Sequence, residues 1–395
     1  MHVTYIHQHF RRPDQPGGTR SWEFARRLAS DGHEVTMICA GAQRRTYVTD
    51  GFTVRQLPVP YRNSLSFAGR IRAFFGFMIL ASIEAVRTPG DVILATSTPL
   101  TVAIPALIAS KARRRPFVFE VRDLWPQVPI ELGYLRNRTI IRLAQALERA
   151  AYRGATQIVA LSPSMAAGVL RIAPRKPVTT IPNSSDIDRF KSVDASEAAD
   201  LRRELGIGAD EALILYAGSL GESYEVDWLV DLAASLPDDS VHVVVAGDGT
   251  TRPTLEAQVQ RLGLEDRVHL LGPRPKAFIA GLYAASDVVA SSLRDHPSLE
   301  GNSLNKVFDA LAAGKPVIFN HGGWLAQLLS TEGAGWRLSR STESAAEELT
   351  ALLQDPRLLA EAGERAHAIA LSDFNRDTHY ANLKRVLLAA EGRRK

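Results

Sequence analysis

The chain has 395 residues, 45% of them hydrophobic and 23% charged, an ordinary globular balance that disfavours a disordered, collagenous or coiled-coil protein. A single cysteine, Cys39, excludes an internal disulfide and a cysteine-built zinc site, and it fits a reducing compartment. The net charge of +4 hides a division, because residues 1–190 carry +13 and residues 191–395 carry −9. The length favours two domains, since single cores stop growing near ~250–300 residues.

The first half of the chain alternates apolar strands with amphipathic helices. An apolar, β-branched run at Val3–Ile6 predicts the first strand, and Ser21–Ser30 carries apolar residues at helical spacing. Further strands are expected at Glu34–Cys39, Val92–Ala95, Pro116–Val121 and Gln157–Ala160, and a helix at Thr139–Arg153. Alternation with fully apolar strands is typical of a parallel sheet covered by helices on both faces.

A second series follows a change of composition near residue 181. The stretch Asp186–Ser196 is polar with little periodicity, so we expect the linker there, between domains 1–190 and 191–372. The final segment, 373–395, is expected to form a helix that packs back towards the first domain. The predicted strands are Leu213–Ala217, Val241–Ala246, Val268–Leu271, Val288–Ala290 and Pro316–Phe319, and the predicted helices are Trp228–Ser235, Leu255–Leu262, Phe278–Ala285, Leu304–Ala313, Ala345–Leu353 and Arg376–Ala390. The sequence therefore predicts an α/β protein of two doubly wound domains facing a cleft.

Two loops before helices have the composition of phosphate-binding sites. Neither a G-x-G-x-x-G nor a Walker A motif is present, which disfavours a nicotinamide enzyme and a P-loop kinase. Gly17-Gly18 follows the first strand, where α/β proteins bind ligands, although a plain turn explains such a pair equally well. The second loop, Ser303–Asn305, opens a helix whose N–H groups suit an anion.

The helix after the second loop carries two further candidates. Lys306 and Asp309 are three residues apart and share a face, so Lys306 is placed to contact a diphosphate and Asp309 to accept bonds from ribose hydroxyls. The alternative is an ordinary ion pair between these two residues on a solvated helix.

Taken in order, the motifs of the chain resemble those of the family 4 retaining glycosyltransferases, which have the GT-B fold. The resemblance is strongest to the branch that builds O-antigens, capsules and other surface polysaccharides. The segments that carry it are His7–Phe10 with Gly17-Gly18, Ala29–Thr36, Ile181–Asp186 with Phe190 ("IPNGVD…F"), Tyr216–Leu220, Val243–Gly249 ("xxGDGP"), Leu271-Gly272, Leu282–Val288 and Leu304–Val317 ("LPSKxFEYLAAGKPV").

The resemblance implies that the second domain binds a nucleotide sugar. Asp309 takes the position of the second Glu of the family's E-x7-E motif, a ribose ligand, whereas Gly301 stands at the first position and Glu300 lies one residue early. In the family a basic pair after the "GxL" motif usually binds the diphosphate, but Gly221–Glu225 offers no lysine here, so Lys306 or Arg294 is expected to compensate. The implied nucleotide-sugar site comprises Gly17, Gly18, Gly218, Gly272, Arg274, Arg294, Ser303, Leu304, Asn305, Lys306 and Asp309, with Lys306 also assigned a catalytic role.

The resemblance places the acceptor on the first domain. Asp123, in an Asp-Leu-Trp-Pro element, is a catalytic candidate that could hold a sugar hydroxyl or take the proton of the acceptor; the alternative is a helix N-cap or turn residue. Arg122 and His9 join it as acceptor ligands. His7 and His9 alternate on a strand end, so both could lie on one face, but they are too few for a metal site.

No metal or other cofactor is expected beyond the nucleotide-sugar co-substrate. Asp186-Ile187-Asp188 has the spacing of a metal signature in another glycosyltransferase fold, but it stands in the linker motif. A helix terminus can stabilise the diphosphate without metal.

The basic first half suggests an anionic membrane surface as a partner. The apolar runs Ala73–Val86 and Pro99–Ser110 fall short of the ~20 residues that span a bilayer. Basic and large apolar residues interleave nearby, a pattern that suits binding to anionic lipid, although solvated arginines on a packed helix are the alternative. They are Arg62, Arg70, Arg72, Arg87, Lys111, Arg113, Arg114 and Arg115, with Phe67, Phe74, Phe75, Phe77 and Met78. Nucleic acid is disfavoured because no known nucleic-acid module is present.

The sequence and the resemblance together predict a retaining glycosyltransferase, peripheral on the cytoplasmic face of the inner membrane. It would move a hexosyl or N-acetylhexosaminyl group from a nucleotide sugar, UDP-linked, to a lipid-diphosphate-linked saccharide. Two alternatives remain open: a GT-B nucleotide-sugar epimerase, and a non-catalytic protein that binds nucleotide sugars.

Overall fold

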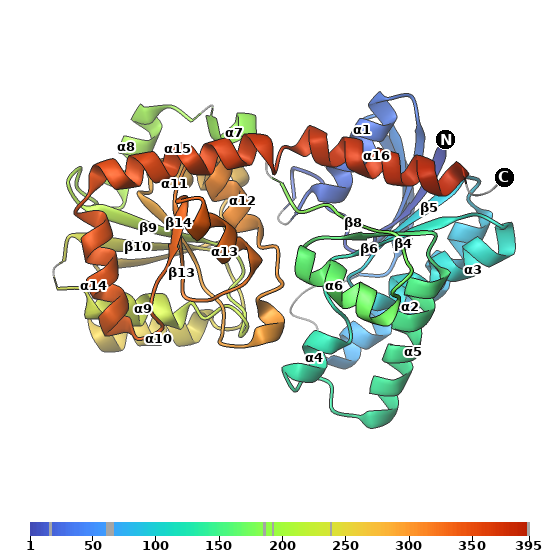
Figure 1. Cartoon of the computed structure of the whole chain (residues 1–395), viewed down its shortest axis with the longest axis horizontal. Helices are drawn as coiled ribbons and strands as arrows, with labels where there is room; N and C mark the ends of the chain where they lie inside the picture. Colours follow the sequence, from blue (N-terminus) through green and yellow to red (C-terminus); the bar gives the residue numbers. More distant parts are fainter. Residues whose placement is uncertain (16–17, 61–66, 185–186, 192, 238, 393–395) are drawn as a thin grey trace. The chain divides into compact units, whose positions relative to one another are not determined.

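The computed structural model describes residues 1–15, 18–60, 67–184, 187–191, 193–237 and 239–392 (Figure 1). The chain forms two compact units: an N-terminal unit, Met1–Pro182 with Asp377–Lys395, and a C-terminal unit, Asn183–Arg376. The division therefore comes before the expected linker. That stretch instead contains helix α7 (Ile187–Lys191) and the start of α8 (Ala195–Glu204), because Ile187 and Phe190 pack on the core of the C-terminal unit.

The N-terminal unit contains an eight-stranded sheet in the order β3-β4-β2-β1-β5-β6-β7-β8. All its neighbouring strands are parallel except β3 and β4, and the central strand β1 sets Val3 opposite both Val35 and Val92. The strands are β1 (His2–Ile6), β2 (Glu34–Gly41), β3 (Arg45–Thr49), β4 (Phe52–Pro58), β5 (Val92–Thr96), β6 (Phe117–Val121), β7 (Gln157–Ala160) and β8 (Val178–Thr180).

The hairpin β3–β4 and the edge strand β8 were not predicted. The hairpin turns at Asp50-Gly51, where both residues have positive φ angles of 47° and 82°. Asp-Gly is the dipeptide that such a two-residue turn favours, so the signal was present in the sequence.

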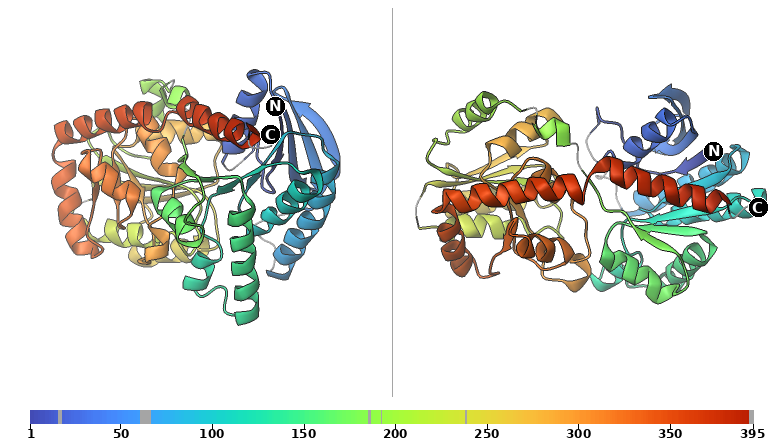
Figure 2. Two further views of the ribbon diagram at one scale, coloured as in Figure 1. Left: turned by 45° about the vertical axis from the view of Figure 1, so that its right-hand side comes forward. Right: turned by 45° about the horizontal axis from the view of Figure 1, so that its top comes forward.

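Helices cover both faces of this sheet (Figures 1 and 2). They are α1 (Arg20–Ser30), α2 (Phe67–Arg87), the 3₁₀ turn η1 (Leu100–Val102), α3 (Ala103–Arg113), α4 (Gln127–Glu131), α5 (Arg138–Gly154), α6 (Pro163–Ile172) and α16 (Arg376–Gly392). One core lies between the sheet and α2, α3 and α5, and a second lies between the sheet and α1 and α16. Among the described residues, no helix is both long and apolar enough to cross a membrane.

The last helix, α16, is part of the N-terminal unit. Leu383 and Leu387 are fully buried in the core that α1 shares. The hydroxyl of Tyr380 donates a hydrogen bond to Asp31 Oδ2 at 2.6 Å, and Lys384 Nζ lies 2.6 Å from the same oxygen. Apolar burial and this polar anchor together hold the end of the chain on α1.

The C-terminal unit contains a six-stranded parallel sheet in the order β11-β10-β9-β12-β13-β14, with a core on each face. All five strands predicted for it are present, whereas the three-residue β14 is too short to show a period. The strands are β9 (Ala212–Ala217), β10 (Val241–Ala246), β11 (Val268–Gly272), β12 (Val288–Ser291), β13 (Val317–Phe319) and β14 (Gly335–Arg337). The remaining helices are α9 (Asp227–Ser235), α10 (Arg252–Leu262), α11 (Lys276–Ala285), η2 (Pro297–Leu299), α12 (Asn305–Ala312), α13 (Trp324–Thr331), α14 (Thr342–Leu353) and α15 (Pro356–Ser372).

Each sheet has one point at which the winding direction reverses. In the C-terminal unit the chain proceeds from β9 to β11 towards one edge and from β12 to β14 towards the other. In the N-terminal unit the reversal falls between β1 and β5. Open α/β sheets bind ligands at the carboxyl ends of the strands beside this point, so each unit has a defined position for a site.

Candidate functional site

The loops after β9 and β10 form a tightly packed floor at the reversal point of the C-terminal unit. Gly218 N donates to Ala246 O at 2.9 Å, and Leu220 N donates to Asp248 O at 3.0 Å. A Cβ atom on Gly247 would lie 1.7 Å from the carbonyl oxygen of Gly218. The close approach of the two backbones therefore requires glycine at position 247.

The N-terminus of α12 faces the same region. Leu304 occupies the N-cap position with extended backbone and cannot cap through its side chain. The preceding loop is fixed by two donors, since Asn183 Nδ2 donates to Ser303 O at 2.9 Å and Trp324 Nε1 donates to Asn302 O at 3.1 Å. Ser303, Leu304 and Asn305 thus lie at an uncapped helix start, which is suited to an anion.

Lys306 is buried rather than solvated. Only 6% of the residue is exposed, and its Nζ lies 3.3 Å from the ring centroid of Tyr216 and 5.1 Å from that of Tyr224. Among the described residues, Nζ has no hydrogen-bond partner, and burial lowers the pKa of Lys306 well below its usual value. A Cβ atom on Gly218 would lie 3.2 Å from Nζ, so the amine reaches the loop after β9.

The alternative of an exposed ion pair between Lys306 and Asp309 is therefore wrong. Asp309 is half-buried on the same helix. Burial of Tyr283 raises the pKa of that residue, and the charge of Asp309 raises it further. Packing of α12 against α15, α7 and β12 leaves Lys306 pointing inward onto the ring of Tyr216, which helical spacing alone could not establish.

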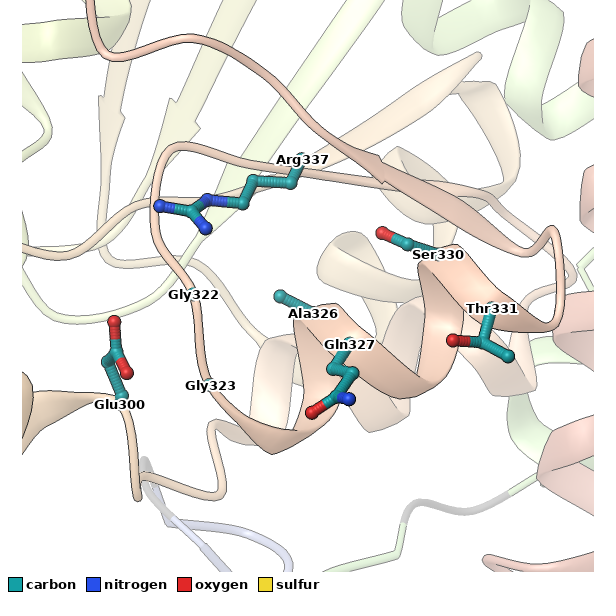
Figure 3. Close-up of a pocket in the computed structure, with 8 residues that line it drawn as sticks. All are labelled: Glu300, Gly322, Gly323, Ala326, Gln327, Ser330, Thr331 and Arg337. Atoms are coloured by element: carbon teal, nitrogen blue, oxygen red, sulfur yellow. The ribbon is translucent and has the colours of Figure 1, made fainter.

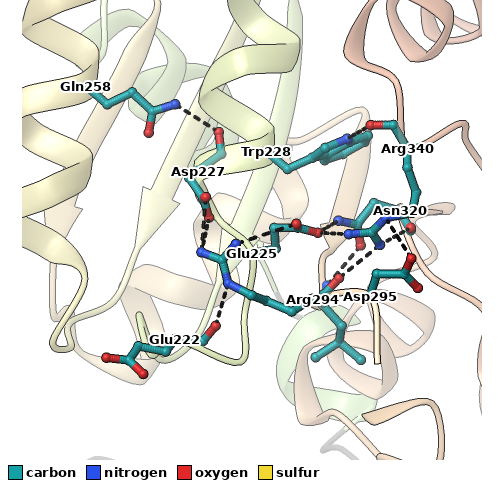
Figure 4. A network of polar contacts seen from close by, with 10 residues as sticks. Glu222, Glu225, Asp227, Trp228, Gln258, Arg294, Asp295, Asn320 and Arg340 are labelled. Atoms are coloured by element: carbon teal, nitrogen blue, oxygen red, sulfur yellow. Dashed lines mark hydrogen bonds and ion pairs between the residues drawn. The ribbon is translucent and has the colours of Figure 1, made fainter. Parts of the chain in front are cut away.

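Arg294 does not point freely into the site, contrary to the expectation that it could replace the missing lysine. Its Nη2 lies 3.1 Å from Asp227 Oδ2, and its Nε donates to Glu222 O at 2.9 Å (Figure 4). The neighbouring Glu225 pairs with Arg340 and accepts from Asn320 Nδ2 at 2.7 Å. Glu225, on the loop after β9, and Asp227, at the start of α9, thus hold the two guanidinium groups, whereas the Lys306 amine has no such carboxylate among the described residues.

Gly272 and Arg274 lie at the end of β11. Gly272 has a φ angle of 71°, and its carbonyl accepts from Gly247 N at 2.9 Å. Arg274 is exposed, with its guanidinium carbon 5.3 Å from the ring centroid of Phe278. Glu300 is exposed as well, beside the turn Gly322-Gly323, while Gly301 is half-buried.

In the N-terminal unit, Gly18 lies directly before α1, and Gly17 falls outside the described residues. Close by, the sequence interpretation missed a buried ion pair in which Arg20 Nε lies 2.9 Å from Glu120 Oε1. Arg20 Nη2 also donates to Ile181 O at 2.8 Å, so this one side chain joins α1, β6 and the residue that follows β8.

Asp123 lies after β6, at the carboxyl edge of the same sheet. Its Oδ2 accepts a hydrogen bond from Thr98 Oγ1 at 2.9 Å. Burial raises the pKa of Asp123, while the Thr98 bond and the charge of Arg122 oppose that rise. Pro126, not Asp123, is the N-cap of α4, so the helix-cap alternative is wrong. Asp123 does lie in a turn, because its carbonyl accepts from Trp125 N at 3.0 Å.

His7 and His9 do not share a face. His7 contacts α1, with Nδ1 2.8 Å from Ser21 Oγ, whereas His9 lies edge-on to Phe74 of α2 at 6.4 Å. The strand ends at Ile6, so strand alternation does not extend to these residues. Burial, and then the charges of Arg11 and Arg122, lower the pKa of His9 to about 4, so it is neutral near pH 7.

Within the described part of the chain, no group of three or more His, Cys, Asp or Glu residues could hold a metal ion. Asp186, the first carboxylate of the Asp-x-Asp sequence, lies outside that part. The arrangement at α12 offers N–H groups and one buried amine to an anion.

Comparison with known proteins identifies the two halves. Residues 17–184 match the glycosyl transferase 4-like domain, and residues 197–368 match the glycosyl transferases group 1 domain. The chain is 31% identical over 209 residues to a D-inositol 3-phosphate glycosyltransferase of Nocardia farcinica, covering 50% of this chain and 44% of that protein. It is 23% identical over 269 residues to the putative colanic acid biosynthesis glycosyl transferase WcaI of Escherichia coli, covering 63% and 66%.

Among solved structures, Anabaena Alr3699/HepE in complex with UDP superimposes with a TM-score of 0.74 at 22% identity, covering 98% of this chain and 100% of that one. The matched regions span about half to two thirds of the two curated relatives. The two domains, taken together with the shared architecture, place this chain among the GT-B glycosyltransferases that combine a 4-like domain with a group 1 domain.

Proposed function

We propose that the protein is a retaining glycosyltransferase that takes a hexosyl or N-acetylhexosaminyl group from a UDP-sugar bound to the C-terminal unit. The observation that carries this proposal is Lys306, a buried amine at the uncapped start of α12 for which the described residues provide no hydrogen-bond partner. A diphosphate would supply the acceptor that Nζ lacks. Its negative charge would also raise the pKa of Lys306, so that the bound state holds an ammonium ion.

The transfer step breaks the bond between the anomeric carbon and the diphosphate oxygen, and the electron pair stays on that oxygen. The N–H groups of Ser303–Asn305 and Lys306 stabilise the charge that develops there. The acceptor hydroxyl oxygen bonds to the anomeric carbon on the same face. Its proton passes to the departing diphosphate.

The donor base is proposed from the relatives. HepE is described in complexes with UDP and with UDP-glucose, which favours UDP here. Asp309 would accept bonds from the ribose, and Gly272 and Arg274 at the end of β11 would border the base. The stacked pair Arg274 and Phe278 offers a flat surface for that base.

The acceptor is proposed to be a saccharide on a lipid diphosphate, used in surface-polysaccharide synthesis. The WcaI relative, named for colanic acid biosynthesis, favours that branch. Asp123, Arg122 and His9 lie at the carboxyl edge of the N-terminal sheet and would contact the acceptor sugar and its charge.

A membrane surface is proposed to bind α2. Its exposed face carries apolar residues at every fourth position, and their exposed fractions are 37% for Ile71, 54% for Phe75, 55% for Ile79 and 45% for Ile83. The exposed cations Arg72, Lys111, Arg113 and Arg114 lie on α2 and at the end of α3. Arg62 lies outside the described residues. Arg115 does not belong to this surface, because it is buried and its guanidinium donates to Thr88 O and Ala85 O. An apolar stripe with nearby positive charge suits the inner face of an anionic membrane.

The test is a thermal-shift screen with UDP-, GDP- and dTDP-sugars, followed by transfer assays with lipid-diphosphate-linked saccharides. We expect a rise in melting temperature with UDP-sugars only, and UDP release that depends on the acceptor. Binding without turnover on any acceptor would favour a non-catalytic protein. Free UDP released together with an altered sugar, without acceptor, would favour an epimerase.

A further inference from the structure

A cavity lies in the C-terminal unit, beside the turn Gly322-Gly323 that follows β13. Its volume is about 500 Å³, within the ~300–1,000 Å³ of small-molecule sites. Figure 3 shows Glu300 and Arg337 approaching the turn from two different segments, and one face of α13 forming a further wall. The lining residues are Glu300, Gly322, Gly323, Ala326, Gln327, Ser330, Thr331 and Arg337.

The polar side chains around this cavity are exposed, and they do not bond to one another. In the part of the chain that the structure describes, no hydrogen bond or ion pair engages the side chains of Glu300, Arg337, Gln327, Ser330 or Thr331. By contrast, nearby Arg294 and Arg340 are both held by carboxylates. A guanidinium, a carboxylate, an amide and two hydroxyls therefore line one solvent-open space, where each is available to a ligand.

The wall of the cavity depends on small residues. A Cβ atom on Gly322 would lie 2.8 Å from Glu300 Oε1, and one on Gly323 would lie 2.2 Å from Glu300 O. Ala326, on α13, is buried beneath the opening. Larger side chains at these positions would displace Glu300 or fill the cavity.

The cavity adjoins the region of Lys306. Gly322 follows His321. Burial lowers the pKa of His321 to about 4, and the charges of Lys306 and Arg337 contribute to that lowering. His321 Nε2 lies 3.1 Å from Ser291 Oγ at the end of β12, next to the reversal point. A ligand in the cavity would therefore lie beside, but not within, the proposed diphosphate site.

We propose that this cavity binds a sugar that carries one acidic group, a carboxylate or a phosphate. The guanidinium of Arg337 would form paired hydrogen bonds with that acidic group, which is the geometry arginine favours. Glu300 would accept bonds from ring hydroxyls, and Gln327, Ser330 and Thr331 can both donate and accept. The acidic sugar is either the sugar of the donor itself, a uronic acid, or a free sugar phosphate.

Isothermal titration calorimetry tests the proposal on the full chain, first saturated with UDP so that the diphosphate site is filled. Glucose 6-phosphate and glucuronate are titrated in turn, with glucose as the uncharged comparison. We expect the acidic sugars to bind at least ~10-fold more tightly than glucose, and Arg337→Ala to weaken them at least ~10-fold. Arg261→Ala removes an exposed arginine of α10 and should change neither affinity. Gln327→Ala should weaken binding less than Arg337→Ala.

A second arm identifies the source of the acidic sugar and rests on the proposed function. If the sugar belongs to the donor, UDP-glucuronate binds more tightly than UDP-glucose, and Arg337→Ala abolishes that preference. If it is a free sugar phosphate, the two UDP-sugars bind alike and only the first arm responds to Arg337→Ala. The proposal is overturned if neither arm depends on Arg337. A protein that fails to bind UDP refutes the donor site instead, because the first arm can still be measured without UDP.

Discussion

Replacing Lys306 with methionine should separate stability from donor binding. Methionine keeps the length of the side chain and removes an amine that is 6% exposed and has no hydrogen-bond partner. Removing an unsatisfied buried polar group should raise the free energy of unfolding by about 1–3 kcal/mol. Losing the contact with the ring of Tyr216 should lower it by about 0.5–2 kcal/mol. The free energy of unfolding should therefore be unchanged or rise slightly.

The same substitution should weaken UDP-glucose binding. A hydrogen bond from a charged donor to a phosphate contributes about 1.5–3 kcal/mol, which corresponds to a ~10- to 150-fold loss of affinity. Urea denaturation measures the first effect and calorimetric titration of UDP-glucose the second, with Lys111→Met, at an exposed lysine of the N-terminal unit, as the matched control. Unchanged donor affinity would show that Lys306 does not contact the donor. A loss of both stability and affinity would show that the amine is structural.

The pH dependence of stability offers an independent check. Burial lowers the pKa of Lys306 well below 10.5, so the unfolded chain binds the proton more tightly than the folded one. The contribution of this group to the free energy of unfolding therefore rises with pH, between the lowered pKa of the folded state and the ordinary pKa of the unfolded chain. Lys306→Met should lose that rise, and a variant with the same pH dependence as the wild type would contradict the argument.

Three further predictions follow from buried contacts and exposed surface. Glu120→Gln should lower the free energy of unfolding by about 3–5 kcal/mol, because it leaves the Arg20 guanidinium buried without its carboxylate. Burial tends to raise the pKa of Glu120, but Arg20 and its other partners lower it below 4.5. The stability from this pair is therefore present above pH 4.5 and is lost on further acidification. Urea titrations across that range would disprove the claim if the wild type and Glu120→Gln behaved alike. Gly247→Ala should lower the free energy of unfolding by at least ~1–3 kcal/mol and abolish UDP-glucose binding, because the added Cβ would lie 1.7 Å from the carbonyl oxygen of Gly218. A variant with wild-type affinity would show that the two loops can move apart. Ile79→Ser should reduce partitioning onto phosphatidylglycerol vesicles ~10-fold in sedimentation assays, whereas equal partitioning would remove α2 from the membrane contact.

Local sequence was sufficient for most of the strands and for the position of the phosphate-binding helix. Apolar runs such as Gln157–Ala160 and Val241–Ala246 agree with β7 and β10 to the residue, because a strand buried on both faces needs no partner to be recognised. The edge strands β8 and β14 were not predicted, because a strand of three residues is too short to show an alternating or apolar pattern. The expected linker was wrong because Ile187 and Phe190 are apolar residues whose partners lie far along the chain.

The sequence by itself determined two α/β units, the order of their strands along the chain and the loop that opens α12. Only the tertiary structure decided that Lys306 faces inward onto Tyr216, that Arg294 is held by Asp227, and that Arg20 meets Glu120. Helical spacing fixes which residues share a face, but the direction of that face depends on how the helix packs on its sheet. Pairs separated by 67 to 100 positions meet only when the winding of the sheet brings their strand ends together.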